Sequence, residues 1–249
     1  MAEAKTLLAT ISKSAYAPPP NINPCEWADK NFYLSAEYTS EPGKYRSDRT
    51  PYQKEPLAML SEAGVHRVVL QWGSQLGKTL IEMIAIGYFA DTKPSPILFV
   101  QPTIETAEGY SKERIAPMIR DTPALKGKFA NPRTRDSGNT ITNKSFPGGH
   151  LAFVGSNSPA GLASRPVRIV LMDEIDRWES DAGGEGDPVN LATKRTATFF
   201  DWLVVMVSTP DIEGESRIEK AYKQGDQRRF YMPCPHCGEK QPLEWERIE

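Results

Sequence analysis

The chain has 249 residues, of which 39% are hydrophobic and 25% charged, a balance typical of a globular protein with a sizeable core. Its 30 basic and 32 acidic residues give a formal net charge of −2, so contact with nucleic acid would have to come from a local patch or a ring of subunits. No apolar run reaches the roughly 20 residues that a membrane helix needs, and the N-terminus does not resemble a signal peptide. Three cysteines are too few for a disulfide framework and indicate a reducing compartment.

The first 50 residues are rich in proline and polar residues and show little hydrophobic periodicity. We expect an arm there, with one short helix around Trp27 to Phe32. From residue 51 onward apolar side chains follow a helical spacing, which predicts a helix over Gln53–Ala63. Pro56 is tolerable only in the first turn of that helix.

Short apolar segments then alternate with helical stretches. This alternation predicts an α/β fold, with a mostly parallel sheet and helices on both of its faces. The segment 121–149 is full of Pro, Gly, Asn and Arg, and we expect a loop or a small hairpin. The predicted strands are Val65–Gln71, Pro96–Val100, His150–Val154, Val167–Met172 and Trp202–Val207, and the predicted helices are Lys78–Ala90, Ile104–Arg120 with a bend or end at Pro117, and Leu191–Phe200.

A candidate phosphate-binding loop lies between the first of these strands and the helix that begins near Lys78. Gly77 allows a tight turn, so that consecutive N–H groups and the positive end of the helix can face a β-phosphate. Lys78 can reach the β- and γ-phosphates, and the Thr79 hydroxyl can ligate Mg²⁺. The usual phosphate-loop motif has its first glycine five positions before Gly77, where this chain has Trp72; Gly73 comes one residue late. An ordinary strand-to-helix turn is therefore the alternative. The expected ATP-binding residues in this run are Gly73, Ser74, Gln75, Leu76, Gly77, Lys78 and Thr79.

A second signal is an apolar strand that ends in two adjacent carboxylates, Asp173 and Glu174. In one class of P-loop enzymes the first acid holds Mg²⁺ and the second polarises the attacking water. The alternative is that Asp173 caps a helix and Glu174 sits in its first turn. Combined with Lys78 and Thr79, the pair predicts nucleotide hydrolysis: Glu174 as the base, Asp173 and Lys78 as further catalytic groups, and Thr79 and Asp173 as metal ligands.

The order and spacing of several runs resemble the large terminase subunit of tailed phages, in particular the lambda-type branch, from about Asn23 to the end of the chain. The resemblance implies a P-loop NTPase domain of the RecA-like (ASCE) type that uses ATP and Mg²⁺ to drive double-stranded DNA into a procapsid. It also implies a small terminase subunit, a portal and a ring of further copies as partners, in the host cytoplasm. The runs are Pro51–Gln53, Gln75–Thr79, Gln101–Thr103, Ser158–Arg165, Leu171–Asp176, Ser208–Pro210 and Pro233–Gly238.

The resemblance assigns roles to further residues. Ser208, Thr209 and Pro210 resemble a motif that couples loss of the γ-phosphate to DNA movement, although these residues also suit an ordinary turn. Gln53 resembles a glutamine that pairs with adenine, and an exposed residue at a helix start is its alternative. Many relatives carry an arginine where this chain has Ser74. We therefore expect a neighbouring subunit to supply one, and we expect the isolated domain to hydrolyse ATP slowly. The candidates are Arg133, Arg135, Arg165 and Arg195.

The last 24 residues look like a different unit. Cys234 and Cys237 form half of a zinc-ribbon knuckle, and a structural zinc ion takes four ligands, so we do not expect Zn²⁺ in this chain. The resemblance places the missing pair, and an endonuclease domain, beyond residue 249. A basic strip could contact DNA phosphates or be a solvated loop; its residues are Lys126, Lys128, Arg133 and Arg135, with Asn131, Asn139 and Asn143 nearby.

We therefore divide the chain into an N-terminal arm (1–50), an ATPase motor domain (51–225) and the start of a Cys-x-x-Cys linker (226–249). Nuclease activity is not expected from these residues. Two other function classes remain: a helicase-like, nucleic-acid-dependent ATPase, and a non-catalytic nucleic-acid-binding scaffold with a degenerate phosphate loop. The lack of a second RecA-like half in the 249 residues disfavours the helicase.

Overall fold

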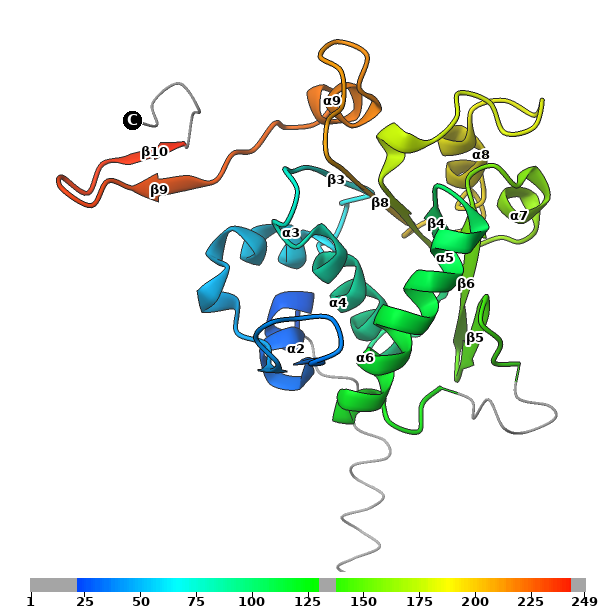
Figure 1. Cartoon of the computed structure of the whole chain (residues 1–249), viewed down its shortest axis with the longest axis horizontal. Coiled ribbons are helices and arrows are strands. Elements are labelled where there is room, and N and C mark those ends of the chain that lie inside the picture. Colours follow the sequence, from blue (N-terminus) through cyan, green and yellow to red (C-terminus); the bar gives the residue numbers. More distant parts are fainter. Residues whose placement is uncertain (1–21, 130–137, 243–249) are drawn as a thin grey trace, which may run out of the picture.

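The computed structural model describes residues 22–129 and 138–242. Within these ranges, the centre of the fold is a six-stranded sheet with the strand order β3-β8-β7-β4-β6-β5 (Figure 1). All neighbouring strands are parallel except β5, which pairs with β6 as an antiparallel hairpin. The strands are β3 (Arg67–Gln71), β4 (Pro96–Gln101), β5 (Asn143–Phe146), β6 (Gly149–Gly155), β7 (Ile169–Asp173) and β8 (Leu203–Ser208).

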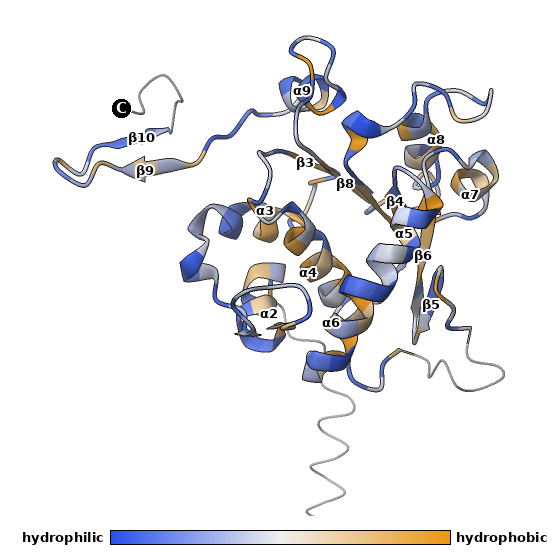
Figure 2. Cartoon of the chain, viewed as in Figure 1, coloured by the Kyte–Doolittle hydropathy of each residue, from blue (hydrophilic) through white to orange (hydrophobic). Residues whose placement is uncertain are grey.

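Helices cover both faces of the sheet, which confirms the predicted fold class. Two separate apolar cores lie on the two sides, and Figure 2 shows hydrophobic residues gathered in the central strands and on α4. The first core includes α2 (Pro24–Asn31), α3 (Lys54–Met59), α4 (Lys78–Asp91), α5 (Ile104–Tyr110) and α6 (Ala116–Asp121); the second includes α7 (Pro159–Ala163), α8 (Pro188–Lys194) and α9 (Arg217–Lys223). None of the helices in the described part of the chain is long and apolar enough to cross a membrane.

Helix α4 is enclosed by the rest of the fold. The ten residues from Ile81 to Ala90 are all buried. A helix that is apolar around its whole circumference belongs in a protein interior, because no face of it favours water. Strands β7 and β8 are likewise buried at every position, as expected of central parallel strands. The helix that carries the phosphate loop is therefore rigidly held.

The described part of the expected arm belongs to this core, so for residues 22–50 the expectation of a separate arm is corrected. Asn23 and Glu26 form a capping box that starts α2. Trp27 is fully buried against α4, where a Cβ on Gly87 would lie 2.6 Å from its ring. Its indole N–H donates to Asp91 at 2.6 Å. These scattered apolar residues show no periodicity in sequence, because they pack against distant elements. Residues 1–21 lie outside the described ranges.

Several predicted elements differ in their ends. The helix expected over Leu191–Phe200 is α8, which starts earlier because the Asp187 side chain caps it and Pro188 occupies its first turn. The helix expected over 104–120 is divided by a π-helical turn, Ser111–Ile115, and Pro117 is the second residue of α6, directly after that turn.

In the segment 121–149, expected to be a loop or a small hairpin, strand β5 forms an antiparallel hairpin with β6. Other short elements were not predicted, among them the 3₁₀ turn Pro123–Leu125. Helix α9 follows its N-cap residue Ser216, whose side chain accepts from the N–H of Glu219. Further 3₁₀ turns precede α3 and follow β7. These 3₁₀ turns are Ser47–Arg49, Pro51–Gln53 and Ile175–Arg177. Two small antiparallel hairpins pair β1 (Tyr33–Leu34) with β2 (Gly43–Lys44) and β9 (Tyr231–Pro233) with β10 (Lys240–Pro242).

Candidate nucleotide site

The carboxyl ends of the parallel strands meet at one edge of the sheet. Strand β8 lies between β3 and β7, with Gln71 opposite Ser208 and Asp173 opposite Val207. This order places the segment after β8 between the phosphate loop and the acidic pair. The N–H of Trp72, at the start of the loop, donates to the Ser208 carbonyl at 3.2 Å. Three motifs that lie far apart in sequence are therefore neighbours in the fold.

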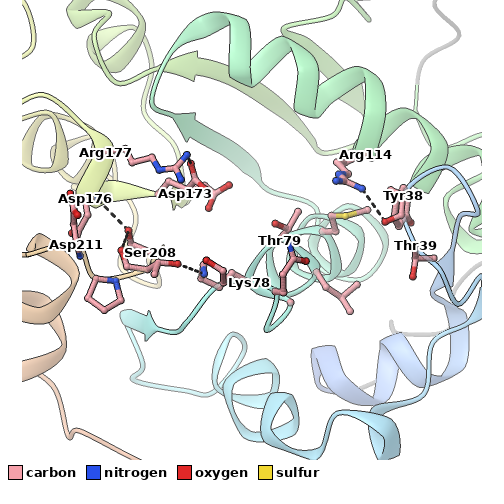
Figure 3. Close-up of a pocket in the computed structure, with 18 of the residues that line it drawn as sticks. Tyr38, Thr39, Lys78, Thr79, Arg114, Asp173, Asp176, Arg177, Ser208 and Asp211 are labelled. Atoms are coloured by element: carbon pink, nitrogen blue, oxygen red, sulfur yellow. Dashed lines mark hydrogen bonds and ion pairs between the residues drawn. The ribbon is translucent and has the colours of Figure 1, made fainter. Parts of the chain in front are cut away.

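These motifs line one cavity of about 670 Å³. Figure 3 shows Lys78 and Thr79 facing the space that Asp173 closes from the other side. Gly73 and Leu76, also expected to bind ATP, are not among its lining residues. Of the residues predicted from the sequence, the cavity is lined by Ser74, Gln75, Gly77, Lys78, Thr79, Asp173, Glu174, Ser208, Thr209 and Pro210.

The phosphate loop adopts a tight turn that leaves the start of α4 open. Gln75 and Gly77 both have positive φ angles, 63° and 81°, and Gly77 is the N-cap of α4 without a side-chain cap. The first N–H groups of this 14-residue helix thus have no side-chain acceptor, which suits an anion. The Lys78 ammonium donates to the Gly73 carbonyl at 2.8 Å and to the Thr209 hydroxyl at 2.8 Å. Desolvation by burial lowers the pKa of Lys78, and the nearby acids, Asp173 first among them, partly oppose this shift.

The two acids have different surroundings. Asp173 is buried at the end of β7 and accepts from the Gln101 amide at 2.8 Å, and burial raises its pKa to about 6. Glu174 has a positive φ of 51°, a strained conformation for a side-chain-bearing residue, and its carboxylate lies 3.0 Å from the Arg177 guanidinium. No side chain caps the 3₁₀ turn that follows. The alternative interpretation of Asp173 as a helix cap is therefore wrong.

Residues 39–249 match the family model described as phage terminase large subunit gpA, ATPase domain. The chain belongs to this family.

Two terminase large subunits are among its relatives. The chain is 32% identical to that of Enterobacteria phage P21, over 98% of this chain and 38% of the relative. It is 28% identical to that of Escherichia phage lambda, over 94% of this chain and 36% of the relative. The terminase ATPase domain described here thus spans little more than a third of the length of these proteins. The resemblance inferred from the sequence is confirmed.

A solved structure shares the fold. The crystal structure of the HK97 bacteriophage large terminase matches 82% of this chain, and 42% of that protein is covered, with a TM-score of 0.61. The sequence identity in this match is 13%, so it supports the α/β P-loop fold alone.

Gln53 of the terminase ATPase domain is not placed as expected. Its side chain is only 1% exposed and does not line the cavity. Its carboxamide is bonded to Tyr45, to Thr50 and to the carbonyl of Leu76 in the phosphate loop. Gln53 is therefore not an exposed residue at a helix start, and its side chain is not open to a base in this structure.

The arginines that line the cavity were not among the sequence candidates. Arg177 pairs with Glu174 as described above, and Arg114 donates to the Tyr38 carbonyl at 3.1 Å and stacks on the Tyr38 ring (Figure 3). Arg114 comes from the π-helical turn, a position that no motif in the sequence marks. Of the four candidates, Arg165 and Arg195 do not line the cavity, and Arg133 and Arg135 lie outside the described residues. Supply of an arginine by a neighbouring subunit stays a prediction.

Asp176 connects the acidic strand end to the segment after β8. Its carboxylate accepts from the Ser216 hydroxyl at 2.5 Å and from the N–H of Ile218 at 2.8 Å, at the start of α9. It also accepts from the N–H of Asp211 at 3.2 Å, and its own N–H donates to the Ser208 hydroxyl at 3.3 Å. These bonds connect the acidic strand end directly to the start of α9.

The predicted metal and DNA residues outside the cavity stay untested. Cys234 and Cys237 flank the turn between β9 and β10, where N–H groups of Cys237 and His236 lower the pKa of Cys234. Among residues 22–129 and 138–242, no three His, Cys, Asp or Glu side chains are grouped to bind a metal ion. Lys128 of the basic strip pairs with Asp91, the last residue of α4, and Lys126 is exposed. Asn143 lies in β5, Asn139 in the irregular segment before it, and Asn131 outside the described residues.

Glu82 is a buried acid one turn beyond Lys78. It is fully buried, and within the described part of the chain neither carboxylate oxygen has a hydrogen-bond partner. Desolvation, with Asp173 and Glu174 nearby, raises its pKa well above 4.5, so the folded state keeps a proton that the unfolded state loses. This difference reduces stability progressively as the pH rises above about 4.5.

We expect Glu82→Gln to gain stability over the wild type as the pH rises, by up to about 1.4 kcal/mol per pH unit, because the amide needs no proton. The measurement is the free energy of unfolding by urea for both proteins at pH 5.5 and pH 8. The exposed Glu62 provides the control variant, Glu62→Gln, measured at the same two pH values. A constant difference for Glu82→Gln would contradict the assignment.

Proposed function

We propose that this chain is the ATP-hydrolysing motor domain of a DNA-packaging terminase. The observation that carries the proposal is the single cavity lined by both Lys78–Thr79 and Asp173–Glu174. A loop that offers helix N–H groups and the Lys78 ammonium, beside paired acids at a strand end, suits a triphosphate and the water that attacks it. Membership of the terminase ATPase family supports ATP as the nucleotide.

The donor set fits Mg²⁺. The Thr79 hydroxyl and the Asp173 carboxylate are hard oxygen ligands of the kind that Mg²⁺ prefers, and both line the cavity. The amide of Gln101 holds Asp173 in one orientation. When bound, Mg²⁺ would neutralise charge on the phosphate oxygens.

The residues of the chain then have distinct tasks. Lys78 exchanges its carbonyl acceptors for phosphate oxygens, and Glu174 accepts a proton from the attacking water. Because Lys78 also donates to the Thr209 hydroxyl, a change in its partners reaches the segment Ser208–Pro210. This contact supports the proposed coupling role of that segment, and Asp176 extends the path to α9.

Replacing Lys78 by alanine is expected to weaken MgATP binding roughly 10- to 150-fold, because a charged hydrogen-bonding group is worth about 1.5–3 kcal/mol. Calorimetric titration of the wild type and of Lys78→Ala with MgATP checks this. Lys126 is exposed and does not line the cavity, so Lys126→Ala is the matched control. Equal affinities for the wild type and Lys78→Ala would reject the site.

The wider activity and the partners are also proposals, since the chain spans little more than a third of its relatives. We propose that it acts on double-stranded DNA, as part of a ring of copies, with a small terminase subunit and a procapsid portal. ATP-dependent protection of DNA from a nuclease inside procapsids tests translocation by the complete terminase. Strand separation without such protection would favour a helicase instead. We do not expect this chain to cut DNA or to bind zinc.

A further inference from the structure

Gln53 connects the segment before α3 to the phosphate loop. Its Oε1 accepts from the Tyr45 hydroxyl at 3.1 Å and from the Thr50 hydroxyl at 2.9 Å. Its Nε2 donates to the Leu76 carbonyl at 3.2 Å. Because a carbonyl can only accept, the amide nitrogen must be the atom that faces Leu76, which fixes the orientation of the carboxamide.

The acceptor side of the network is also fixed. Tyr45 is buried, and desolvation raises the pKa of its hydroxyl to about 12, so it keeps its proton at neutral pH. An amide oxygen has two lone pairs, and the two hydroxyls take both. Pairing with adenine would require a free donor and a free acceptor on one exposed edge. Gln53 would have to break these bonds and leave the interior to offer them.

The contact with Leu76 decides the direction of the next N–H group. In a trans peptide the C=O and N–H bonds lie in one plane and point in opposite directions. The Leu76 carbonyl is held towards Gln53, and a second donor, the Tyr52 hydroxyl, bonds to the same oxygen at 3.2 Å. The N–H of Gly77 in that peptide therefore points away from Gln53. Gly77 lines the cavity, so its N–H is available to a phosphate oxygen there.

Gln53 also lies directly against the turn. A Cβ on Gly77 would come within 2.4 Å of the Gln53 Nε2 atom, and the φ of Gly77 is +81°. The amide thus occupies the space that any side chain at position 77 would need. The loop can shift towards α3 only by displacing Gln53.

We infer that Gln53 is a positioning residue for the phosphate loop: it aims the Gly77 N–H at the phosphates of a nucleotide and does not read the base. This inference rests on the proposed nucleotide site. It predicts that the contribution of Gln53 is the same for any ligand that carries the same phosphate chain.

The test uses Gln53→Met, which keeps the length of the side chain, removes the amide donor and adds no charge. Dissociation constants are measured by calorimetry for MgATP, MgGTP and magnesium tripolyphosphate, which has no base. One hydrogen bond is worth roughly 2- to 12-fold in affinity, and we expect all three ligands to lose the same factor within that range. We expect the thermal midpoint to fall as well, because the hydroxyls of the buried Tyr45 and of Thr50 lose their acceptor. A merely structural role would lower the midpoint and leave the affinity for all three ligands unaltered.

A loss confined to MgATP would overturn the inference in favour of base reading, and no loss for any ligand would overturn it as well. Tyr45→Phe removes one donor to Oε1 and leaves Gln53 in place, so it should give a smaller loss that is again equal for the three ligands. If Gln53→Met does not fold, Tyr45→Phe replaces it: an equal loss for the three ligands supports the inference, and a loss confined to MgATP or no loss overturns it. The exposed Tyr231 supplies the control Tyr231→Phe. Failure of the wild type to bind tripolyphosphate and MgATP would instead reject the proposed site, and the inference with it.

Discussion

Glu174→Gln is expected to lower the rate of ATP hydrolysis by about 10²–10⁴-fold while MgATP binding is retained. Glutamine has nearly the shape of glutamate but cannot accept the proton of the attacking water. Lys78, Thr79 and Asp173, which would hold the phosphates and the metal, are unchanged. Phosphate release measures the rate, and calorimetric titration with MgATP measures the binding.

The matched control for this variant is Glu179→Gln, an exposed glutamate outside the cavity lining. It should hydrolyse ATP like the wild type. Equal hydrolysis by the wild type and Glu174→Gln would reject Glu174 as the base. Loss of binding together with hydrolysis would show instead that Glu174 holds the nucleotide or the fold.

Trp27→Ala is expected to destabilise the protein by about 3–5 kcal/mol, because a large buried side chain leaves a cavity that its neighbours only partly fill. Trp27 is fully buried, contacts Tyr88 edge to face with ring centroids 6.4 Å apart, and donates to Asp91. Truncation also leaves Asp91 without its indole partner. Unfolding by urea, followed by circular dichroism, measures the change.

Phe200→Ala is the control, since that aromatic ring is 90% exposed. We expect it to alter the free energy of unfolding by less than about 0.5 kcal/mol. A similarly small change in Trp27→Ala would mean that the segment around α2 is an arm after all. The result therefore decides between a Trp27 packed in the core, as in the structure, and the separate arm expected from the sequence.

The local motifs could be predicted because each is a short pattern with its own chemistry. Gly77-Lys78-Thr79 follows a strand, and Asp173-Glu174 ends one, so the strand-to-loop context alone identifies both. The central strands could be predicted for the same reason, since β7 and β8 are apolar at almost every position. These features depend on neighbours in the chain.

Other site features depend on neighbours in space. Gln53 fits a sequence motif for base recognition, yet its amide is turned into the fold by the Tyr45 and Thr50 hydroxyls. Arg114 reaches the cavity from a π-helical turn that no pattern marks. The Asp176 carboxylate has its partners some 35 to 42 positions away. Hydrogen-bond partners at such separations are set by how the elements pack.

The sequence by itself determined the fold class, the phosphate loop, the acidic strand end and the family, because hydrophobic period and motif spacing are local. Only the tertiary structure decided that buried residues of 22–50 belong to the core, which arginines reach the cavity, and that the buried Gln53 amide donates to the Leu76 carbonyl. The physical reason is that burial and hydrogen-bond partners are properties of the packed chain. A side chain such as Trp27 or Gln53 acquires its role only when α4 and the sheet are in place.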